Sequence, residues 1–411
     1  MKRVVITGMG CVSPLGNSIS TMWARLQKGE NAIREIQTIP LDTIPVRLAA
    51  EVLDFNAEEQ GLDKATVRHN DRYALFALAA ARQAMNDSGL NVGVDVQPER
   101  LGTAIGSGIG GIHTFNAQHT ELLKSGARRI SPLFIPMMIA NIASGNVAIA
   151  HNAQGPCLPV VTACATGTHS IGEAFRMIKE GRADAMITGG AEATICEIAI
   201  GGFANSKALS TSDDPNAASL PFDARRKGFV MGEGSGIMIL EDYEIAKRRG
   251  AHIYAEVVGY GNTCDAHHYT APRPDGKCAA NAMKLALEEG GYDGSSLYIN
   301  AHGTGTPLND KSETAAIKIA LGEAEARKTV ISSTKSMMGH MLGATGAVEL
   351  IISALTLHDG VVAPTINLRE ADPDCDLDYT PNTARRYQAE YAISNTFGFG
   401  GHNACVALKR M

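Results

Sequence analysis

A cysteine stands where an apolar run gives way to a helical pattern. Residues 160–162, Val-Val-Thr, precede Cys164, and apolar residues then recur over 171–178 at the i, i+3, i+4, i+7 spacing of one helix face. At the first turn of a helix, unsatisfied N–H groups and the positive end of the dipole lower the pKa of a thiol and make it a nucleophile. The same N–H groups can hold a developing oxyanion. A buried structural cysteine is the alternative that the local sequence leaves open.

Two histidines and a lysine lie farther along the chain, in turns rich in small residues. His302 follows a strand-like run in NAHGTGTPLNDKSE, and His340 precedes a helical pattern in SSTKSMMGHMLGATGAVE, five residues after Lys335. A third loop, ISNTFGFGGHNAC, contains Phe399 between glycines and can offer a backbone N–H. Glycines permit close approach of a substrate. The two histidines in such turns are therefore explained equally well by one catalytic site or by two separate structural roles.

A glycine motif at 106–111, Gly-Ser-Gly-Ile-Gly-Gly, fits the dinucleotide-binding pattern G-x-G-x-x-G and follows a strand-like run. The acidic residue that binds a ribose about 20 residues later is missing, since the chain reads Arg-Arg-Ile-Ser at 128–131. The motif therefore predicts close backbone packing around a buried pocket rather than a dinucleotide site.

Charge and cysteine usage exclude several classes of protein. The 37 basic and 43 acidic residues give a formal net charge of -6, which argues against a nucleic-acid binder. The eight cysteines show no C-x-x-C pair and no zinc-ligand spacing, as expected of reduced thiols in the cytoplasm. The chain enters the strand-like run 4–7 without a signal-peptide pattern, which also predicts a cytoplasmic protein.

One long segment, residues 130–172, contains no Asp, Glu, Lys or Arg. Such a length raises the question of a membrane span. The prolines at 132 and 136, together with several Asn, His and Gln residues, interrupt it, so it offers no continuous apolar helix of about 20 residues. The segment is predicted to lie in the protein interior or at a subunit interface, with no membrane span.

The elements that must position these residues alternate along the chain. Short apolar runs predict strands at 101–105, 158–162, 185–188, 255–258, 297–301 and 330–333. Helical spacing follows Cys164 and recurs over 344–355. Strands alternating with helices predict an α/β protein. The runs VVITGMG at 4–10 and AEVVGYG at 255–261 are weakly similar, as in an internal repeat. The two halves of such a repeat would meet near Gly250.

Taken together, the motifs resemble those of the β-ketoacyl-[acyl-carrier-protein] synthases, the elongating type I/II group and type II in particular. VVITGMGCVSPLG, TACATGTHSIGEA, PFDARRKGFVMGEGSG and the three loops with His302, His340 and Phe399 occur in the expected order. The resemblance implies a duplicated thiolase-like fold with five layers, α-β-α-β-α. It also implies an N-terminal half at 1–250 with the cysteine, a C-terminal half at 251–411 with the histidines, and a homodimer.

The resemblance also implies roles for single residues. Cys164 would take the acyl group from its carrier as a thioester. His302 and His340 would serve decarboxylation of the malonyl thioester, because two imidazole donors can stabilise the enolate that loss of CO₂ leaves. Lys335 would act electrostatically beside Glu349. The backbone N–H groups of Cys164 and Phe399 would form the oxyanion hole.

Further residues match the family in binding and supporting positions. Thr304 and Thr306 would bind the phosphopantetheine arm, and Asp310 and Glu313 would support the histidine loop. The acyl pocket is predicted at Ile109, Phe134 and Phe203, beside the glycines Gly398 and Gly400. A monovalent cation site is predicted at Asn300, Glu349, Ser394 and Asn395, and carrier-protein docking at Lys64, Arg68, Arg128, Arg129 and Lys207.

The implied activity is decarboxylative Claisen condensation of an enzyme-bound acyl group with malonyl-[acyl-carrier protein] in fatty-acid elongation. No cofactor is required, since phosphopantetheine arrives on the carrier protein. A ketosynthase of a type II polyketide or aryl-polyene pathway would carry the same residues. A non-catalytic chain-length partner lacks the nucleophile and is disfavoured by Cys164. A thiolase would need a second cysteine in the C-terminal loop, where this chain has 398–401, and synthase III would not have His340.

Overall fold

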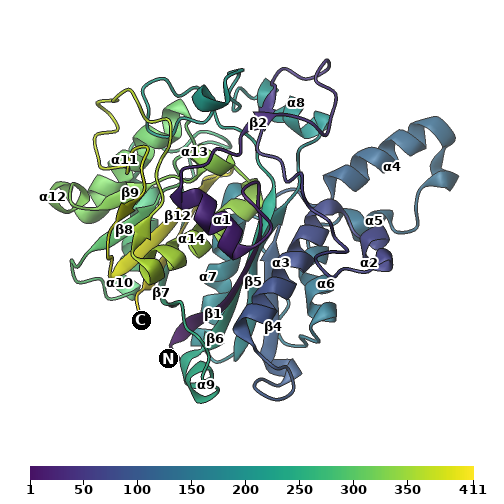
Figure 1. Cartoon of the computed structure of the whole chain (residues 1–411), viewed down its shortest axis with the longest axis horizontal. Coiled ribbons are helices and arrows are strands. Elements are labelled where there is room, and N and C mark those ends of the chain that lie inside the picture. The colour runs from purple at the N-terminus through teal and green to yellow at the C-terminus, as the bar shows by residue number, and fades with distance from the viewer.

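Nine strands form one mixed sheet across the whole chain in the computed structural model, which describes residues 1–411 (Figure 1). Their spatial order is β4-β5-β6-β1-β7-β13-β12-β8-β9. The strands are β1 (Val4–Val12), β4 (Leu101–Gly106), β5 (Ala185–Glu192), β6 (Gly234–Asp242), β7 (Ala255–Cys264), β8 (Leu297–Asn300), β9 (Val330–Ser332), β12 (Tyr391–Gly398) and β13 (His402–Lys409). Two small sheets pair β2 (Arg34–Glu35) with β3 (Leu48–Ala49) and β10 (Val361–Val362) with β11 (Arg385–Arg386).

Fourteen helices surround and penetrate this sheet. They are α1 (Ile19–Gln27), α2 (Lys64–His69), α3 (Arg72–Ser88), α4 (Ile112–Ser125), α5 (Phe134–Met138), α6 (Ile142–Ala150), α7 (Thr166–Lys179), α8 (Glu197–Asn205), α9 (Tyr243–Arg248), α10 (Lys277–Glu289), α11 (Pro307–Leu321), α12 (Glu323–Ala326), α13 (Lys335–Met338) and α14 (Thr345–Asp359). Five 3₁₀ turns accompany them: η1 (Pro98–Arg100), η2 (Ala127–Arg129), η3 (Ala163–Ala165), η4 (Pro215–Ala217) and η5 (Leu342–Ala344).

The sheet topology repeats itself, and this is the strongest sign of duplication in the chain. In the first half β1 pairs with β6, β6 with β5, and β5 with β4, and only the last of these pairs is parallel. In the second half β7, β13, β12 and β8 pair in the same order and the same directions. The halves join where β1 and β7 pair over three residues. The weak sequence similarity between 4–10 and 255–261 therefore marks equivalent strands.

Helices on both faces and between the halves produce five layers. α3 packs on one outer face, against β1, β5 and β6, and α10 packs on the other, against β7 and β13, with α11 beside α10. α7 and α14 contact each other and strands of both halves, so they form the middle layer. The largest hydrophobic cluster, 44 buried residues, surrounds these two helices, and two smaller clusters lie under the outer helices. The predicted five-layered α/β architecture is confirmed.

Local sequence signals fix the ends of the helices. Asp71 caps α3 through its side chain, and Gly89 ends it in the left-handed conformation, at φ 61°. The same device, Gly360 at φ 64°, ends α14. None of the helices combines the length and the apolar composition needed to cross a membrane.

One predicted strand does not form within the chain. Residues 158–162 run beside the edge of the sheet, but only Cys157 makes a bridge, to Thr103 on β4. The Leu158 N–H donates to the Thr103 carbonyl at 3.1 Å, and regular pairing then stops. The segment has the β-branched composition of a strand, yet no strand of this chain lies on its outer side. In the equivalent place of the second half, β9 has residues 378–380 beside it, through a bridge between Val330 and Asp378.

An arm formed by α4, η2 and α5 projects from the body of the molecule (Figure 1). Along the chain, the arm lies between β4 and α6 and directly follows the glycine motif at 106–111. Several large apolar side chains on and near it are exposed: Phe115, Leu122, Leu123, Ile135 and Ile149. The charge-free segment 130–172 thus does not lie wholly in the interior, and its exposed apolar residues are typical of a surface that another protein covers.

Candidate active site

Cys164 sits in a strained turn at the start of a central helix. The turn η3 contains it and runs directly into α7. Ala163, the residue before it, has φ 51°, in the left-handed region that an alanine rarely adopts. The Thr166 hydroxyl accepts from the Thr162 N–H at 2.9 Å and holds the turn on its other side. Such a turn presents the side chain at its apex away from the backbone, as in a nucleophile elbow.

A second turn of the same kind brings His340 to the first. The turn η5 precedes α14 as η3 precedes α7, and its first residue, Leu342, has φ 44°. The two helix starts touch through glycine, since a Cβ on Gly167 would lie 2.9 Å from both Gly343 O and Ala347 N. No larger residue fits there without moving backbone. The contact places the residues that precede α14 next to those that precede α7.

A cavity of about 340 Å³ joins most of the predicted site residues. Cys164, His302, His340 and Phe399 all line it, as do Phe203, Thr304, Thr306, Gly398 and Lys207. The other lining residues are Ser206, Ala208, Lys227, Phe229, Asp265, Thr270, Ala271, Pro272, Pro307, Leu308, Asn309, Phe397, Gly401 and Asn403. Residues from both halves of the chain therefore meet at one concave surface.

Burial changes the expected electrostatics of the thiol. Cys164 is buried, and desolvation raises its pKa to about 12. The Lys335 ammonium and the N–H groups of Phe399 and Cys164 itself act in the opposite direction. The helix start therefore favours the thiolate, as predicted, but burial outweighs it. The expectation of a lowered resting pKa is wrong, and the resting nucleophile is a neutral thiol that must lose its proton during the reaction.

The two N–H groups that act on the thiol are those predicted for the oxyanion hole. The backbone N–H groups of Phe399 and Cys164 both act to lower the pKa of Cys164. Gly398 makes this approach possible, since a Cβ there would lie 3.2 Å from the backbone N of Cys164 and 2.7 Å from Thr162 O. A carbonyl oxygen of a thioester formed on Sγ could accept from both groups.

His302 and His340 lie against each other, with ring centroids 5.3 Å apart and rings nearly perpendicular. Burial, and then the positive charge of Lys335, holds the pKa of each imidazole well below its usual value. Nδ1 of His340 is 3.0 Å from the Thr345 hydroxyl, which can donate to it and so leave the proton on Nε2. Neutral imidazoles with a hydrogen on Nε2 are the donors that an enolate needs.

Lys335 does not line the cavity and lies behind it, in a buried ion pair. Its Nζ is 2.5 Å from Oε1 of Glu349, and both side chains are almost fully buried. Burial raises the pKa of the Glu349 carboxyl to about 7, and Lys335 opposes the rise. The pair therefore places one positive charge within reach of both histidines and the thiol, as the proposed electrostatic role requires.

Two buried carboxylates hold the histidine loop through its backbone. Glu313 accepts from the N–H groups of His302 at 2.8 Å and Gly303 at 2.7 Å. Asp310 accepts from Thr304 and Gly305 at 3.1 Å. The carboxylates thus support the loop as predicted, and they do so by binding main-chain N–H groups rather than the imidazole rings. This arrangement fixes His302 without adding a proton acceptor to the cavity.

The residues predicted to hold a monovalent cation converge behind the histidine loop. Asn300 ends β8, which pairs with β12 where Ser394 lies opposite Asn300, and Asn395 follows. Buried oxygens of all three and of Glu349 have no hydrogen-bond partner: Asn300 Oδ1, Ser394 Oγ, Asn395 Oδ1 and Glu349 Oε2. Unpaired buried oxygens are costly, and a cation would satisfy them. The donor set fits the prediction, and the ion would supply a counter-charge to Glu349. No cluster of three His, Cys, Asp or Glu residues suited to a metal ion occurs.

Three predicted pocket residues do not line the cavity. Ile109 lies at the root of the arm and Phe134 on the arm, both outside the cavity, and Gly400 is not among the residues that line it. The glycine motif that contains Ile109 packs on the buried carboxylate of Glu192, which accepts from the Gly108 N–H at 2.8 Å. This confirms close backbone packing at the motif. The roles of Ile109 and Phe134 in an acyl pocket stay predictions.

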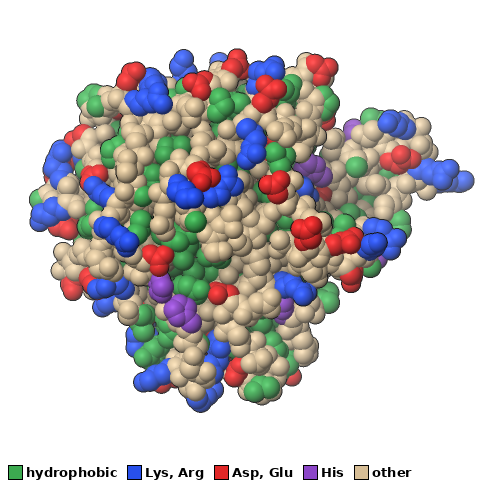
Figure 2. All heavy atoms as spheres, in the orientation of Figure 1, with side chains coloured by type: hydrophobic (Ala, Val, Ile, Leu, Met, Phe, Trp, Pro, Cys, Tyr) green, Lys and Arg blue, Asp and Glu red, His purple; other side chains and the backbone are tan.

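The predicted docking residues are distributed over three elements. Lys64 and Arg68 lie on α2, Arg128 and Arg129 on η2 in the arm, and Lys207 directly after α8. All five are exposed, and Figure 2 shows basic side chains at the tip of the arm. Only Lys207 lines the cavity. Elsewhere on the face in view, acidic and basic side chains are mixed.

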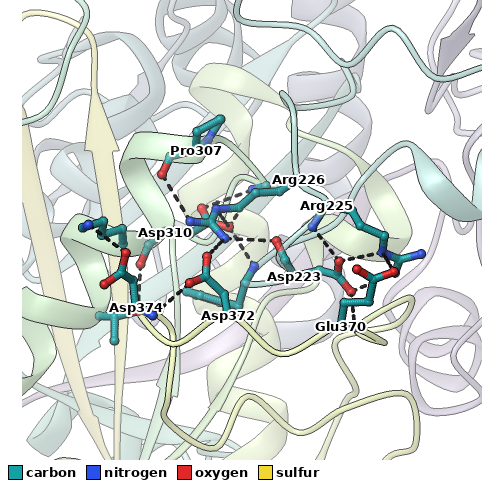
Figure 3. A network of polar contacts seen from close by, with 12 residues as sticks. Asp223, Arg225, Arg226, Pro307, Asp310, Glu370, Asp372 and Asp374 are labelled. Carbon is teal, nitrogen blue, oxygen red and sulfur yellow. Dashed lines mark hydrogen bonds and ion pairs between the residues drawn. The ribbon is translucent and has the colours of Figure 1, made fainter.

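Sequence reasoning missed two buried charges that shape the site. Glu192 also accepts from the Gly343 N–H at 3.0 Å, and so ties the motif at 106–111 to the turn η5. Arg226 donates to the carbonyl of Thr306 at 3.2 Å and pairs with Asp372 at 2.5 Å (Figure 3). The motif PFDARRKGF contains Arg226, but nothing in the sequence shows that this arginine is the buried one of the three consecutive basic residues.

Two family models match the chain along most of its length. The β-ketoacyl synthase N-terminal domain matches residues 1–246, and the β-ketoacyl synthase C-terminal domain matches residues 254–369. The chain belongs to the β-ketoacyl synthase family.

Within this family, the chain is similar over its whole length to individual synthases. The chain is 51% identical over 410 residues to 3-oxoacyl-[acyl-carrier-protein] synthase 2 of Staphylococcus aureus (strain N315), which covers 100% of this chain and 98% of the relative. The synthase 2 of Synechocystis sp. is 49% identical over 411 residues, with the same coverage. A solved β-ketoacyl synthase from Burkholderia phymatum matches with a TM-score of 0.92, 36% identity and 100% coverage of both chains. A chain from a type II polyketide carrier protein in complex with its ketosynthase matches with a TM-score of 0.92 and 34% identity, over 100% of this chain and 99% of the other.

The raised pKa of Cys164 predicts how its reactivity depends on pH. Because the thiol is neutral below a pKa of about 12, the thiolate fraction should rise about tenfold per pH unit from pH 7 to 9.5. Alkylation of Cys164 by iodoacetamide, followed by peptide mass spectrometry in the absence of acyl donor, measures it. A free cysteine peptide in the same sample should begin to level off above its pKa of about 8.5. A plateau for Cys164 below pH 8.5 would contradict the neutral resting thiol.

Proposed function

We propose that the protein is a 3-oxoacyl-[acyl-carrier protein] synthase that elongates fatty-acyl chains. The observation that carries this proposal is the shared cavity, in which a nucleophile from the N-terminal half faces two neutral imidazoles from the C-terminal half. Identity of 49% to 51% over whole chains to synthases of this name supports it.

The first half-reaction loads the acyl group. Sγ of Cys164 attacks the carbonyl carbon of the acyl thioester on the carrier protein, and the tetrahedral oxyanion accepts from the N–H groups of Cys164 and Phe399. The carbon–sulfur bond to the carrier breaks, and the carrier thiol leaves with the proton that Cys164 gave up. The product is an acyl thioester on Cys164, and the protein carries no new net charge.

The second half-reaction forms the new carbon–carbon bond. Malonyl-carrier protein loses CO₂, and the electron pair of the broken bond becomes an enolate whose oxygen accepts from Nε2 of His302 and His340. The enolate carbon attacks the acyl carbon on Cys164, and Sγ leaves as a thiolate that takes up one proton from water. The products are 3-oxoacyl-carrier protein, CO₂ and the free enzyme. Neutral histidines serve as donors here, which is why burial of both rings supports the proposal.

The carrier arm supplies phosphopantetheine, and the proposed reaction uses no other cofactor. Thr304, which is buried, and Thr306, which is half-buried, line the cavity and can bind the arm. A ketosynthase of a polyketide pathway would have the same chemistry, and solved structures of that class match at 34% identity. The higher identity to the elongating synthases favours fatty-acid elongation. Eight free cysteines fit the reducing cytoplasm, where we place the enzyme.

Acylation of a single cysteine tests the proposed chemistry. Incubation with carrier proteins that hold acyl groups of different length should add one acyl mass to the enzyme, measured by intact-protein mass spectrometry. Cys164→Ala should lose the adduct, since no other thiol lies at the oxyanion hole, and Cys405→Ala should keep it. An adduct on another residue, or none with any donor, would contradict the proposal.

We further propose that carrier protein docks on the basic side chains of the arm. Acidic carrier proteins are steered by local positive charge, and Arg128 and Arg129 are exposed and free of ion pairs with acidic residues. Arg128→Glu with Arg129→Glu should raise KM about tenfold for acyl-carrier protein and spare acyl-pantetheine. Lys247→Glu with Arg248→Glu, an equally exposed basic pair at the end of α9, should leave both values unchanged. An equal loss with both donors would remove the arm from the docking surface.

We also propose that two copies of the chain form a homodimer through the open sheet edge at 157–162. Leu158 and Val161 are 53% and 55% exposed, although they lie in the charge-free segment and beside the nucleophile turn. An unpaired edge with apolar side chains is suited to pair with the same edge of a second copy. The exposed apolar side chains of the arm would extend the covered area.

Charge at this edge should separate the copies. Leu158→Asp with Val161→Asp should convert a particle of twice the 43.3 kDa chain mass to a monomer, as sedimentation velocity can measure. The reason is that two buried, unpaired carboxylates per chain would cost several kcal/mol at the interface. Val94→Asp, at a residue that is 79% exposed on another surface, serves as the control. A monomeric wild-type protein, or a variant that stays dimeric, would contradict this interface.

A further inference from the structure

Three consecutive basic residues, Arg225-Arg226-Lys227, have three different environments. Arg225 forms an ion pair with Asp223 at 2.8 Å, and the buried Arg226 pairs with Asp372 (Figure 3). Lys227 has neither an ion pair nor a hydrogen bond from its ammonium group, and it is exposed. It lines the same cavity as the thiol. The one free charge of the run is therefore the one that faces the active-site cavity.

The residues on both sides of Lys227 are bound to the turn that carries the two threonines of the cavity, Arg226 through its side chain and Gly228 through its backbone. Arg226 donates to Thr306 O at 3.2 Å, and the Gly228 N–H donates to Gly305 O at 3.1 Å. These anchors bind the preceding and the following residue. Lys227 therefore projects from a rigid position immediately beside the Thr304–Thr306 turn.

A second free ammonium group lies across from it. Leu209 and Phe229 form a parallel bridge, in which the Phe229 N–H donates to Ala208 O at 3.0 Å. Lys207 and Lys227 each lie two residues before the bridge and both line the cavity. Lys207 is also exposed and forms no ion pair. Its φ of 57° is rare for lysine, so the local structure holds it in a conformation that its own backbone disfavours.

Other charges in the cavity do not neutralise these lysines. Asp265 is the one carboxylate among the lining residues, and it forms no ion pair with Lys207 or Lys227; it accepts instead from the Arg273 N–H at 2.9 Å and from Asn403 Nδ2 at 2.8 Å. Two lysines on adjacent segments repel each other unless an anion lies between them. The solvent-exposed end of the cavity therefore favours a negatively charged ligand group. The buried end, at Cys164, has no such pair of ammonium groups.

We propose that Lys227, together with Lys207, binds the phosphodiester group of the phosphopantetheine arm. The inference rests on the proposed function and adds a subsite to it. From thioester to phosphate, the arm presents a reacting carbonyl, two amides and then a single negative charge. The cavity presents Cys164 at its buried end, the hydroxyls of Thr304 and Thr306, and two ammonium groups at its exposed end. Lysine is a common ligand of phosphate, to which it donates as a point charge.

Three acyl donors with the same acyl chain separate the phosphate from the carrier protein: acyl-pantetheine, acyl-phosphopantetheine and acyl-carrier protein. Only the last two contain phosphate, and only the last contains protein. Lys227→Met should raise KM about tenfold for acyl-phosphopantetheine and acyl-carrier protein, and leave kcat and the KM for acyl-pantetheine within twofold. The rate of mass increase on Cys164 measures both constants. The rise should shrink at high salt, because the site is open to solvent.

Matched variants exclude a general loss of structure. Lys227→Arg keeps the charge and should recover most of the affinity for acyl-phosphopantetheine. Lys207→Met should act in the same direction as Lys227→Met. Lys328→Met removes an exposed lysine that does not line the cavity and should change no value.

The outcomes distinguish this subsite from the enzyme's function. An equal rise in KM for acyl-pantetheine and acyl-phosphopantetheine would overturn the phosphate subsite. A rise with acyl-carrier protein alone would also overturn it, and would assign Lys227 to an acidic side chain of the carrier. If wild-type Cys164 accepts an acyl group from none of the three donors, the proposed function itself fails, and the subsite fails with it.

Discussion

The close contact between two helix starts, one from each half of the chain, is the constraint on which the site depends. α7 and α14 meet where Gly167 approaches the backbone of Gly343 and Ala347. Gly190 on β5 packs against the same Gly343 carbonyl, so a Cβ there would lie 2.4 Å away. Because no side chain separates these segments, the nucleophile before one helix and the histidine before the other share a cavity. The duplicated fold thus provides two similar turns, and the chemistry uses them differently.

Charges behind the cavity do most of the positioning, and they act on the backbone. Glu313 and Asp310 bind N–H groups of the histidine loop, Glu192 binds those of two glycine turns, and Arg226 donates to the carbonyl of Thr306. Each is buried, and each would be costly without these partners. The loops carry no regular secondary structure, so these charged side chains take the place of a hydrogen-bonded ladder. The rings of His302 and His340 remain free of carboxylates and stay neutral.

Much of the fold could be predicted from the spacing of apolar residues, because helix faces and strands depend on residues close together in the sequence. Spacing over 171–178 located α7, and short apolar runs located β4, β5, β7, β8 and β9. The run 158–162 has the composition of a strand but lacks a partner in the chain, and composition cannot reveal that. The sequence similarity between 4–10 and 255–261 is weak, whereas the strand order of the two halves is clearly the same. A duplicated fold keeps its strand order longer than it keeps its residues.

Site residues could be predicted where a reactive residue type stands in a glycine-rich or helix-initiating turn. Properties that depend on burial, such as the direction of a pKa shift, could not. Cys164, His302, His340 and Phe399 were found and share one cavity, but the sign of the Cys164 pKa shift depended on desolvation that a string of residues does not contain. Arg226 and Lys227 are adjacent in sequence and similar in type, yet one is buried and one faces the cavity. Neither Ile109 nor Phe134 lines the cavity: Phe134 lies on α5 in the arm, and Ile109 lies in the glycine motif that packs on the buried Glu192.

The two ends of the large sheet differ, and the difference limits assembly. On one end, residues 378–380 lie along β9 and occupy its outer side. On the other end, beyond β4, the segment at 157–162 has no such neighbour. A sheet with a single open end can join only one other sheet of the same kind, after which no free end remains. Association through this edge therefore terminates by itself and cannot grow into a fibre, even though the exposed segment has the composition of an aggregation-prone strand.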